Sequence, residues 1–76
     1  MYDNQQQMLH TIAETAKILH VNISYVHRLR RAGLLPAIKL GCYKVRDDAL
    51  REFLRRYEGW DLTDPENPVQ INGGAV

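Results

Sequence analysis

A short run in the middle of the chain holds residue types that could bind a polyanion. Residues 25–31, YVHRLRR, contain His27 and three arginines, with no carboxylate among them. Guanidinium groups donate hydrogen bonds to phosphate oxygens, and in pairs to the O6 and N7 atoms of guanine. The chemistry that this run predicts is recognition of a nucleic acid by charge and hydrogen bonding.

The charge of the chain is unevenly distributed, although its formal net value is only +1. Residues 15–46 carry seven lysines and arginines and no Asp or Glu, whereas residues 57–76 carry four acids and no base. An ordinary solvated helix face mixes both signs. The basic middle third is therefore interpreted as the electrostatic footprint of a polyanion-binding protein.

Other kinds of chemistry lack the residues that they need. The sequence has no carboxylate pair, no Cys–His arrangement and no phosphate-cradling loop, so we expect no enzyme. His10, His20 and His27 have no partners at ligand spacing, so we expect neither a metal nor another cofactor. Cys42 stands alone and forms no internal disulfide. With no apolar run of about 20 residues and no signal peptide, we expect a cytoplasmic, nucleoid-associated protein without membrane or small-molecule partners.

Capping signals predict two helices before residue 33. Thr11 begins a capping box, TIAE, ahead of a helix that ends near residue 19. Asn22 caps a second helix over residues 23–32, and Gly33 stops it. Two helices joined by three residues are typical of a helix-turn-helix.

After Pro36 the hydrophobic pattern changes from the period of a helix to that of a strand. Residues 37–40 and 43–45 read as two strands around a Gly41-Cys42 turn. Asp47 is then expected to cap a third helix that ends at Gly59. The fold class is therefore mainly α with a small β-hairpin, a winged helix-turn-helix. We expect a flexible leader over residues 1–9, the domain over 10–59 and an extended acidic tail over 60–76.

A helical projection separates the second helix into two faces. Val26 and Leu29 lie on one side at about 100° per residue. On the opposite side lie Ser24, His27, Arg28 and Arg31. The hairpin adds Lys39, Lys44 and Arg46 beside this helix. A basic helix next to a basic hairpin is predicted to contact a groove of duplex DNA and its bounding backbone.

The segment TIAETAKILHVNISYVHRLRRAGLLPAIKLG…KVRDDALREFL resembles excisionase-type winged helix-turn-helix domains, which are relatives of MerR DNA-binding heads. The resemblance covers about residues 10–57. It implies that the second helix enters the major groove and that the hairpin is a wing on the minor groove or its backbone. The DNA-binding residues that it implies are Asn22, Ser24, Tyr25, His27, Arg28 and Arg31 in the recognition helix with its cap, and Lys39, Tyr43, Lys44 and Arg46 in the wing.

One departure from the family concerns the turn between the helices. His20 stands where these proteins usually have Gly, at a position that often requires a positive φ. His adopts that conformation better than most residues do, so we expect the turn to form at some cost in stability.

The resemblance implies an excisionase of a mobile element, which bends DNA and assists an integrase, with neighbouring copies on adjacent sites. A transcriptional regulator of a phage or mobile element would use the same head. A DNA-packaging or replication adapter, whose basic surface binds an acidic protein, is a further alternative. Because DNA binding depends steeply on salt, a salt titration on duplex DNA separates the adapter from the other two.

Overall fold

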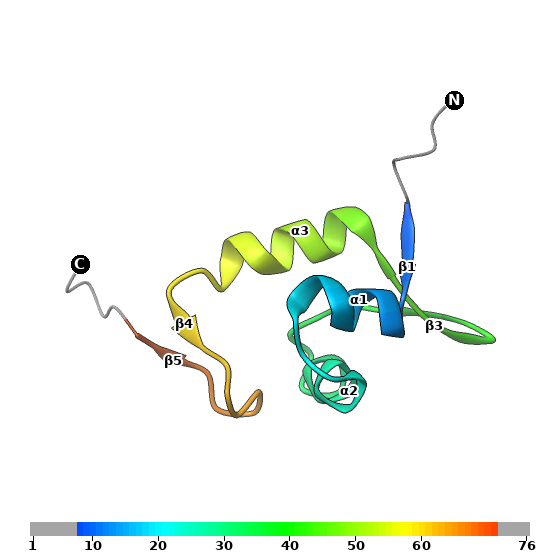
Figure 1. Cartoon of the computed structure of the whole chain (residues 1–76). Helices are drawn as coiled ribbons and strands as arrows, with labels where there is room; N and C mark the ends of the chain where they lie inside the picture. The colour runs from blue at the N-terminus through cyan, green and yellow to red at the C-terminus, as the bar shows by residue number, and fades with distance from the viewer. Residues whose placement is uncertain (1–7, 72–76) are drawn as a thin grey trace.

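The computed structural model describes residues 8–71, which form three helices, a three-stranded sheet and a separate pair of short strands (Figure 1). In chain order the elements are β1 (Leu9–Thr11), α1 (Ile12–Leu19), α2 (Ile23–Arg31), β2 (Ile38–Leu40), β3 (Cys42–Arg46), α3 (Asp47–Arg56), β4 (Trp60–Asp61) and β5 (Val69–Gln70). None of these helices has the length and apolar character needed to cross a membrane within residues 8–71.

Side-chain caps begin both helices of the helix-turn-helix, as the sequence predicted. The Thr11 hydroxyl accepts a hydrogen bond from the Glu14 amide at 3.0 Å, and the Glu14 carboxylate accepts one from the Thr11 amide at 2.8 Å. The Asn22 side chain accepts from the Tyr25 amide at 3.0 Å. These bonds satisfy backbone donors that have no partner inside a helix. The predicted bounds of α1 and α2 are confirmed to within a residue.

The two helices end in the same hydrogen-bonding pattern. At the end of α1 the amide of Val21 donates to Ala16, and that of His20 donates to Lys17. These are the 6→1 and 5→2 bonds of a Schellman motif, which requires a left-handed residue. His20 takes that conformation with φ 60°, as expected for the position where the family has Gly. Gly33 fills the equivalent place after α2 with φ 82°.

The three-stranded sheet has the order β1-β3-β2, with β3 antiparallel to both neighbours. The β2–β3 hairpin turns at Gly41, whose φ is 80°, as the sequence predicted. The strand β1 was not predicted, because residues 1–9 were expected to form a flexible leader. Leu9 pairs with Arg46 in β3 instead, and residues 1–7 lie outside the described part of the chain.

The core lies between the helix-turn-helix, the inner face of β3 and one side of α3. Val26 and Leu29 of α2 are buried completely, which agrees with the helical projection. Val45 of β3 is also fully buried and joins the sheet to the helices. The remaining buried apolar residues of this core are Ile12, Ala16, Leu35, Leu50 and Phe53.

The start of α3 differs from the prediction. The N-cap is Arg46, which makes no side-chain capping bond, and Asp47 is already the first helical residue. The Asp47 carboxylate accepts hydrogen bonds from His10 at 2.7 Å and from Arg51 at 2.7 Å. His10 is buried and lies in β1. The carboxylate expected to cap α3 therefore ties β1 to that helix.

The segment after α3 is folded back on the domain over residues 60–71, which differs from the extended tail expected there. The strands β4 and β5 pair antiparallel, and the loop between them reaches α2 (Figure 1). Tyr57 packs edge-on against Trp60, with ring centroids 5.8 Å apart. Leu62 packs against the core, and Pro65 is buried completely. Residues 72–76 of the expected tail lie outside the described residues.

Candidate nucleic-acid interface

The solvent side of α2 is the centre of the candidate interface. Ser24 and Arg31 are exposed there, on the side of the helix opposite the buried Val26 and Leu29. His27 and Arg28 lie to either side of them, because successive residues of a helix are about 100° apart. We call these four outward residues, Ser24, His27, Arg28 and Arg31, the α2 ridge. The structure places them together as the sequence predicted.

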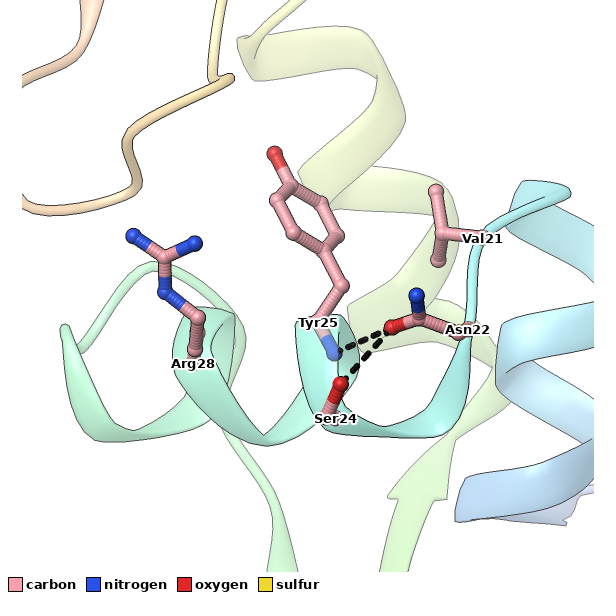
Figure 2. A pocket seen from close by; sticks show the side chains of 5 residues that line it. All are labelled: Val21, Asn22, Ser24, Tyr25 and Arg28. Atoms are coloured by element: carbon pink, nitrogen blue, oxygen red, sulfur yellow. Dashed lines mark hydrogen bonds between the residues drawn. The ribbon is translucent and has the colours of Figure 1, made fainter.

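A shallow pocket lies at the first turn of α2 (Figure 2), lined by Val21, Asn22, Ser24, Tyr25 and Arg28. The Asn22 side-chain oxygen accepts from the Tyr25 amide and, at 2.9 Å, from the Ser24 hydroxyl. Asn22 therefore fixes the start of the helix and the position of Ser24. This is a structural role, in addition to the DNA contact predicted for it.

One flank of α2 contacts the β2–β3 hairpin through Tyr43. The Arg30 guanidinium lies over the Tyr43 ring, 3.8 Å from its centroid, and the Lys39 ammonium lies 5.0 Å from it. The His27 ring meets the Tyr43 ring edge-on, with centroids 6.1 Å apart. We call these four residues the Tyr43 cluster. Cations attract the face of an aromatic ring, so the cluster holds the hairpin against the helix and keeps its positive charge.

Arg30 is the functional candidate that the sequence missed. Only its contact with Tyr43 reveals that it joins the helix to the hairpin. Its guanidinium also lies 3.2 Å from Nδ1 of His27. Because arginine only donates hydrogen bonds, His27 Nδ1 accepts, and the neutral ring carries its proton on Nε2. His27 is thereby left with an N–H donor for a ligand.

The hairpin presents its predicted contact residues on two faces. Residues directly opposite each other on paired strands point to the same side, and neighbours along a strand point to opposite sides. Lys39 lies opposite Tyr43, on the face that meets α2. Lys44 and Arg46 lie on the other face of β3. The sequence analysis grouped the three hairpin cations beside α2, whereas this register divides them between two faces of the hairpin.

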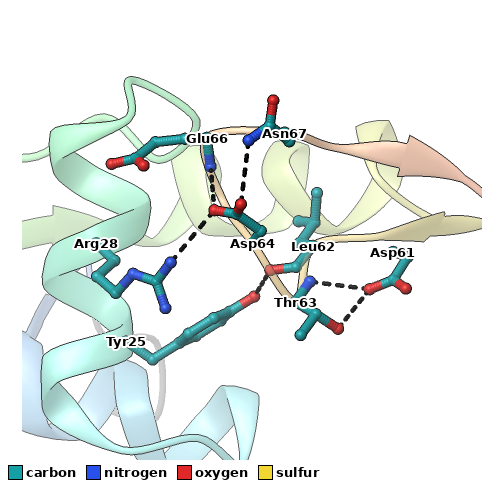
Figure 3. A network of polar contacts seen from close by, with 8 residues as sticks. All are labelled: Tyr25, Arg28, Asp61, Leu62, Thr63, Asp64, Glu66 and Asn67. Atoms are coloured by element: carbon teal, nitrogen blue, oxygen red, sulfur yellow. Dashed lines mark hydrogen bonds and ion pairs between the residues drawn. The ribbon is translucent and has the colours of Figure 1, made fainter.

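The opposite flank of α2 contacts the segment after β4 (Figure 3). The Tyr25 hydroxyl donates to the carbonyl oxygen of Leu62, and the Arg28 guanidinium donates to the Asp64 carboxylate at 3.3 Å. Burial raises the pKa of the Tyr25 hydroxyl; the Arg28 guanidinium lowers it by less, and the nearby carboxylates of Asp61 and Asp64 add smaller increases. The run around Arg28 contains no acid, yet Asp64 supplies a carboxylate partner from 36 residues away.

The remaining predicted cations differ in whether they are paired. Arg46 is exposed and forms an ion pair with Asp48 of α3. Arg31, Lys39 and Lys44 form no ion pair with any carboxylate within residues 8–71. Among the described residues no cluster of three or more His, Cys, Asp or Glu could hold a metal ion. The site is therefore suited to binding an anion by charge and hydrogen bonds.

Comparison with known proteins places the residues of the candidate interface in a known domain family. The family model of a helix-turn-helix domain matches residues 11–58, more than half of the chain. The chain belongs to this helix-turn-helix family. No curated protein and no solved structure matches it. The matched residues include all of α1, α2, the hairpin and α3, and every predicted contact residue lies within residues 11–58.

Membership of the helix-turn-helix family supports sequence-specific binding of double-stranded DNA. Domains of this family are typically not enzymes. The three helices and small sheets of this protein are compatible with such a domain. The second helix of the matched helix-turn-helix is α2, which carries the exposed ridge.

Proposed function

We propose that this helix-turn-helix protein binds a specific duplex sequence with α2 in the major groove and the β2–β3 hairpin as a wing beside it. The observation that carries the proposal is the α2 ridge. It lies on the second helix of the matched domain, faces solvent and includes Arg31, which no carboxylate within residues 8–71 pairs. An unpaired, exposed guanidinium is ready to bind a phosphate or a guanine edge.

The residues take different roles in this arrangement. Ser24 and Arg31, at the centre of the ridge, contact base edges, because they project farthest from the core. Arg28 and the outward N–H of His27 bind the phosphates that border the groove. Lys39 reaches the backbone on the hairpin side, where the Tyr43 cluster fixes it relative to α2.

Within this function we propose the role of an excisionase, which bends its site and positions an integrase. The resemblance of residues 10–57 to excisionase-type domains supports that role over others. A transcriptional regulator remains the second candidate, because the same head serves both. A permutation-bending assay on the bound site, followed by excision assays with the integrase, separates the two: a regulator leaves excision unchanged.

A salt titration tests DNA binding itself. If about four to six side chains meet phosphates, log K falls with log[salt] at a slope of about −4 to −5. The measurement is fluorescence anisotropy on a labelled duplex over a range of salt concentrations. A flat response on duplex DNA would favour the adapter, whose basic surface meets a protein instead.

The variant Arg31→Ala tests the ridge. We expect a loss of about 5- to 100-fold on the preferred sequence and a much smaller loss on unrelated duplexes, since a good base contact is worth about 1–3 kcal/mol. The control is Arg55→Ala, which removes an exposed arginine from α3. Equal losses for the two variants would contradict the assignment of α2 as the recognition helix.

A further inference from the structure

An acidic loop lies directly beside the ridge that is proposed to meet DNA. Residues 61–67, from the last residue of β4 into the loop that leads to β5, carry Asp61, Asp64 and Glu66 and include no basic residue. The Asp64 carboxylate lies 3.3 Å from the Arg28 guanidinium (Figure 3). A carboxylate is thus held at a guanidinium that would otherwise be open to a phosphate. We call residues 61–67 the acidic loop.

The acidic loop is held in place by its own bonds and by the core. The Asp61 carboxylate accepts from the Thr63 hydroxyl at 2.5 Å and from the Thr63 amide at 2.9 Å, and Asp64 accepts from the Asn67 side chain at 3.0 Å. These bonds lower the pKa of both carboxyl groups, so both are charged at neutral pH. Pro65, within the loop, is fully buried. The negative charge therefore has a fixed position relative to α2.

The ion pair between the loop and the ridge is easily exchanged. The side chains of Arg28 and Asp64 are 44% and 52% exposed, so water screens their attraction. Exposed pairs of this kind contribute little to stability. A phosphate that approaches Arg28 can replace Asp64 there, whereas the hydroxyl of Tyr25 keeps the loop attached through Leu62.

We propose that the acidic loop competes with DNA for the α2 ridge, with Asp64 occupying Arg28 in the free protein and a DNA phosphate replacing it in the complex. This inference rests on the proposed function. The competition lowers affinity for any duplex, because phosphate contacts carry no sequence information. Binding that relies on phosphates alone is thereby weakened, and contacts to base edges become necessary.

A different role would have the opposite effect. Asp64 could instead orient Arg28 for its DNA contact, as a carboxylate often orients a guanidinium. Removing the carboxylate would then weaken DNA binding. The sign of the change therefore distinguishes competition from positioning.

The first test removes the charge of Asp64 in the full chain. For Asp64→Asn we expect a dissociation constant about two- to fivefold lower than the control on a mixed-sequence duplex at low salt, with the gain shrinking as salt is added. The control is Glu52→Gln, which changes the net charge equally on α3. A value for Asp64→Asn equal to or weaker than the control would overturn the proposal.

Asp64→Asn also alters the hydrogen bond to Asn67 and could therefore disturb the loop. A second variant separates the effect of charge from such a disturbance. Glu66 contributes only its backbone amide to the hydrogen bonds described in the loop. Glu66→Gln should therefore tighten binding in the same direction but by less, with unchanged thermal unfolding. Binding at the level of Glu52→Gln for both loop variants would contradict competition.

A double-mutant cycle locates the competition at Arg28. Arg28→Ala should weaken DNA binding more in the Asp64→Asn background than in the natural chain, because only there is Arg28 fully available to a phosphate. Equal losses in both backgrounds would place the effect elsewhere and overturn the exchange.

The same measurements separate this inference from the proposed function. If Arg31→Ala weakens binding while the loop variants match their control, the DNA-binding function stands and the competition is refuted. If neither the natural chain nor any loop variant binds duplex DNA, both are refuted. Binding that appears only in the loop variants would support both.

Discussion

Tyr43 is the residue through which the hairpin and α2 act as one surface. Its ring receives the Arg30 guanidinium on its face and is met by the edge of His27. A stacked guanidinium stays charged and keeps donors at its rim, so the contact joins two elements and leaves their charge available. A leucine at position 43 could fill space but could not attract the cations.

Asp47 acts at the same scale, as the acceptor between β1 and α3. Hydrogen bonds from Arg51 first, and then from His10, hold the pKa of this carboxyl below its ordinary value of 3.8. A carboxyl with a lowered pKa in the folded state contributes stability above its unfolded pKa, and that contribution is lost as the pH falls through the folded value. Asp47 therefore supports the fold at neutral pH and ceases to do so in acid.

We predict that Asp47→Asn lowers the free energy of unfolding at neutral pH and has a much smaller effect well below pH 3.8, where the natural carboxyl is itself protonated. Urea unfolding at the two pH values measures this. Glu52→Gln is the control for loss of an exposed α3 carboxylate. If Asp47→Asn lowers the free energy of unfolding by the same amount at both pH values, the amide disturbs packing and the loss of charge is not the cause.

At the scale of elements, the turn between α1 and α2 contains the one described residue other than glycine with a positive φ. His20 adopts φ 60°, whereas the matching position after α2 is Gly33. A side chain in the left-handed region is strained relative to glycine, although less for His than for bulkier or branched residues. The two helix ends therefore have the same geometry but different backbone strain.

We predict that His20→Gly raises the free energy of unfolding by about 0.5–1 kcal/mol and leaves DNA affinity unchanged. Gly33→Ala should lower the free energy of unfolding by about 1 kcal/mol. The cause would be the strain of a positive φ alone, since an added Cβ there meets no atom within 4 Å. Chemical denaturation measures both. A destabilised His20→Gly protein would mean that the imidazole itself stabilises the turn.

Elements defined by local signals were predictable, and those that depend on distant partners were not. The caps at Thr11 and Asn22 and the stop at Gly33 are readable from a few residues, so α1 and α2 were placed correctly. The strand β1 has three residues and forms only because β3 accepts it. No local pattern in residues 8–11 predicts that pairing.

The candidate site likewise has one part that the sequence predicted and another that it did not. The α2 ridge follows from the helical period, which the sequence contains directly. The contact of Arg28 with Asp64 spans 36 residues, and charge counting along the basic run could not foresee it. The stacking of Arg30 on Tyr43 likewise depends on how the hairpin folds against α2.

At the scale of the whole molecule, the segment after α3 belongs to the domain. Leu62 packs against the core, and its own carbonyl oxygen accepts a hydrogen bond from the Tyr25 hydroxyl. Tyr57 connects Phe53 to Trp60, with centroid distances of 5.3 and 5.8 Å. A chain of aromatic contacts therefore leads from the core to β4.

We predict that Leu62→Ala lowers the free energy of unfolding by about 1–2 kcal/mol, because a half-buried leucine loses part of its contact with the core. Val69→Ala, at a side chain 59% exposed, should change it by less than about 0.5 kcal/mol. Thermal unfolding by circular dichroism measures both. Equal, small effects would show that residues 60–71 add nothing to the stability of the helix-turn-helix.

Because α2 lies between Tyr43 and Asp64, its position affects the orientation in which the protein approaches the negatively charged duplex. Lysine stands on one side of the helix and carboxylates on the other, so the charges that flank α2 form an electric dipole transverse to this helix. A polyanion exerts a torque on such a dipole before any atom touches. The protein would arrive rolled about the helix axis, hairpin edge leading.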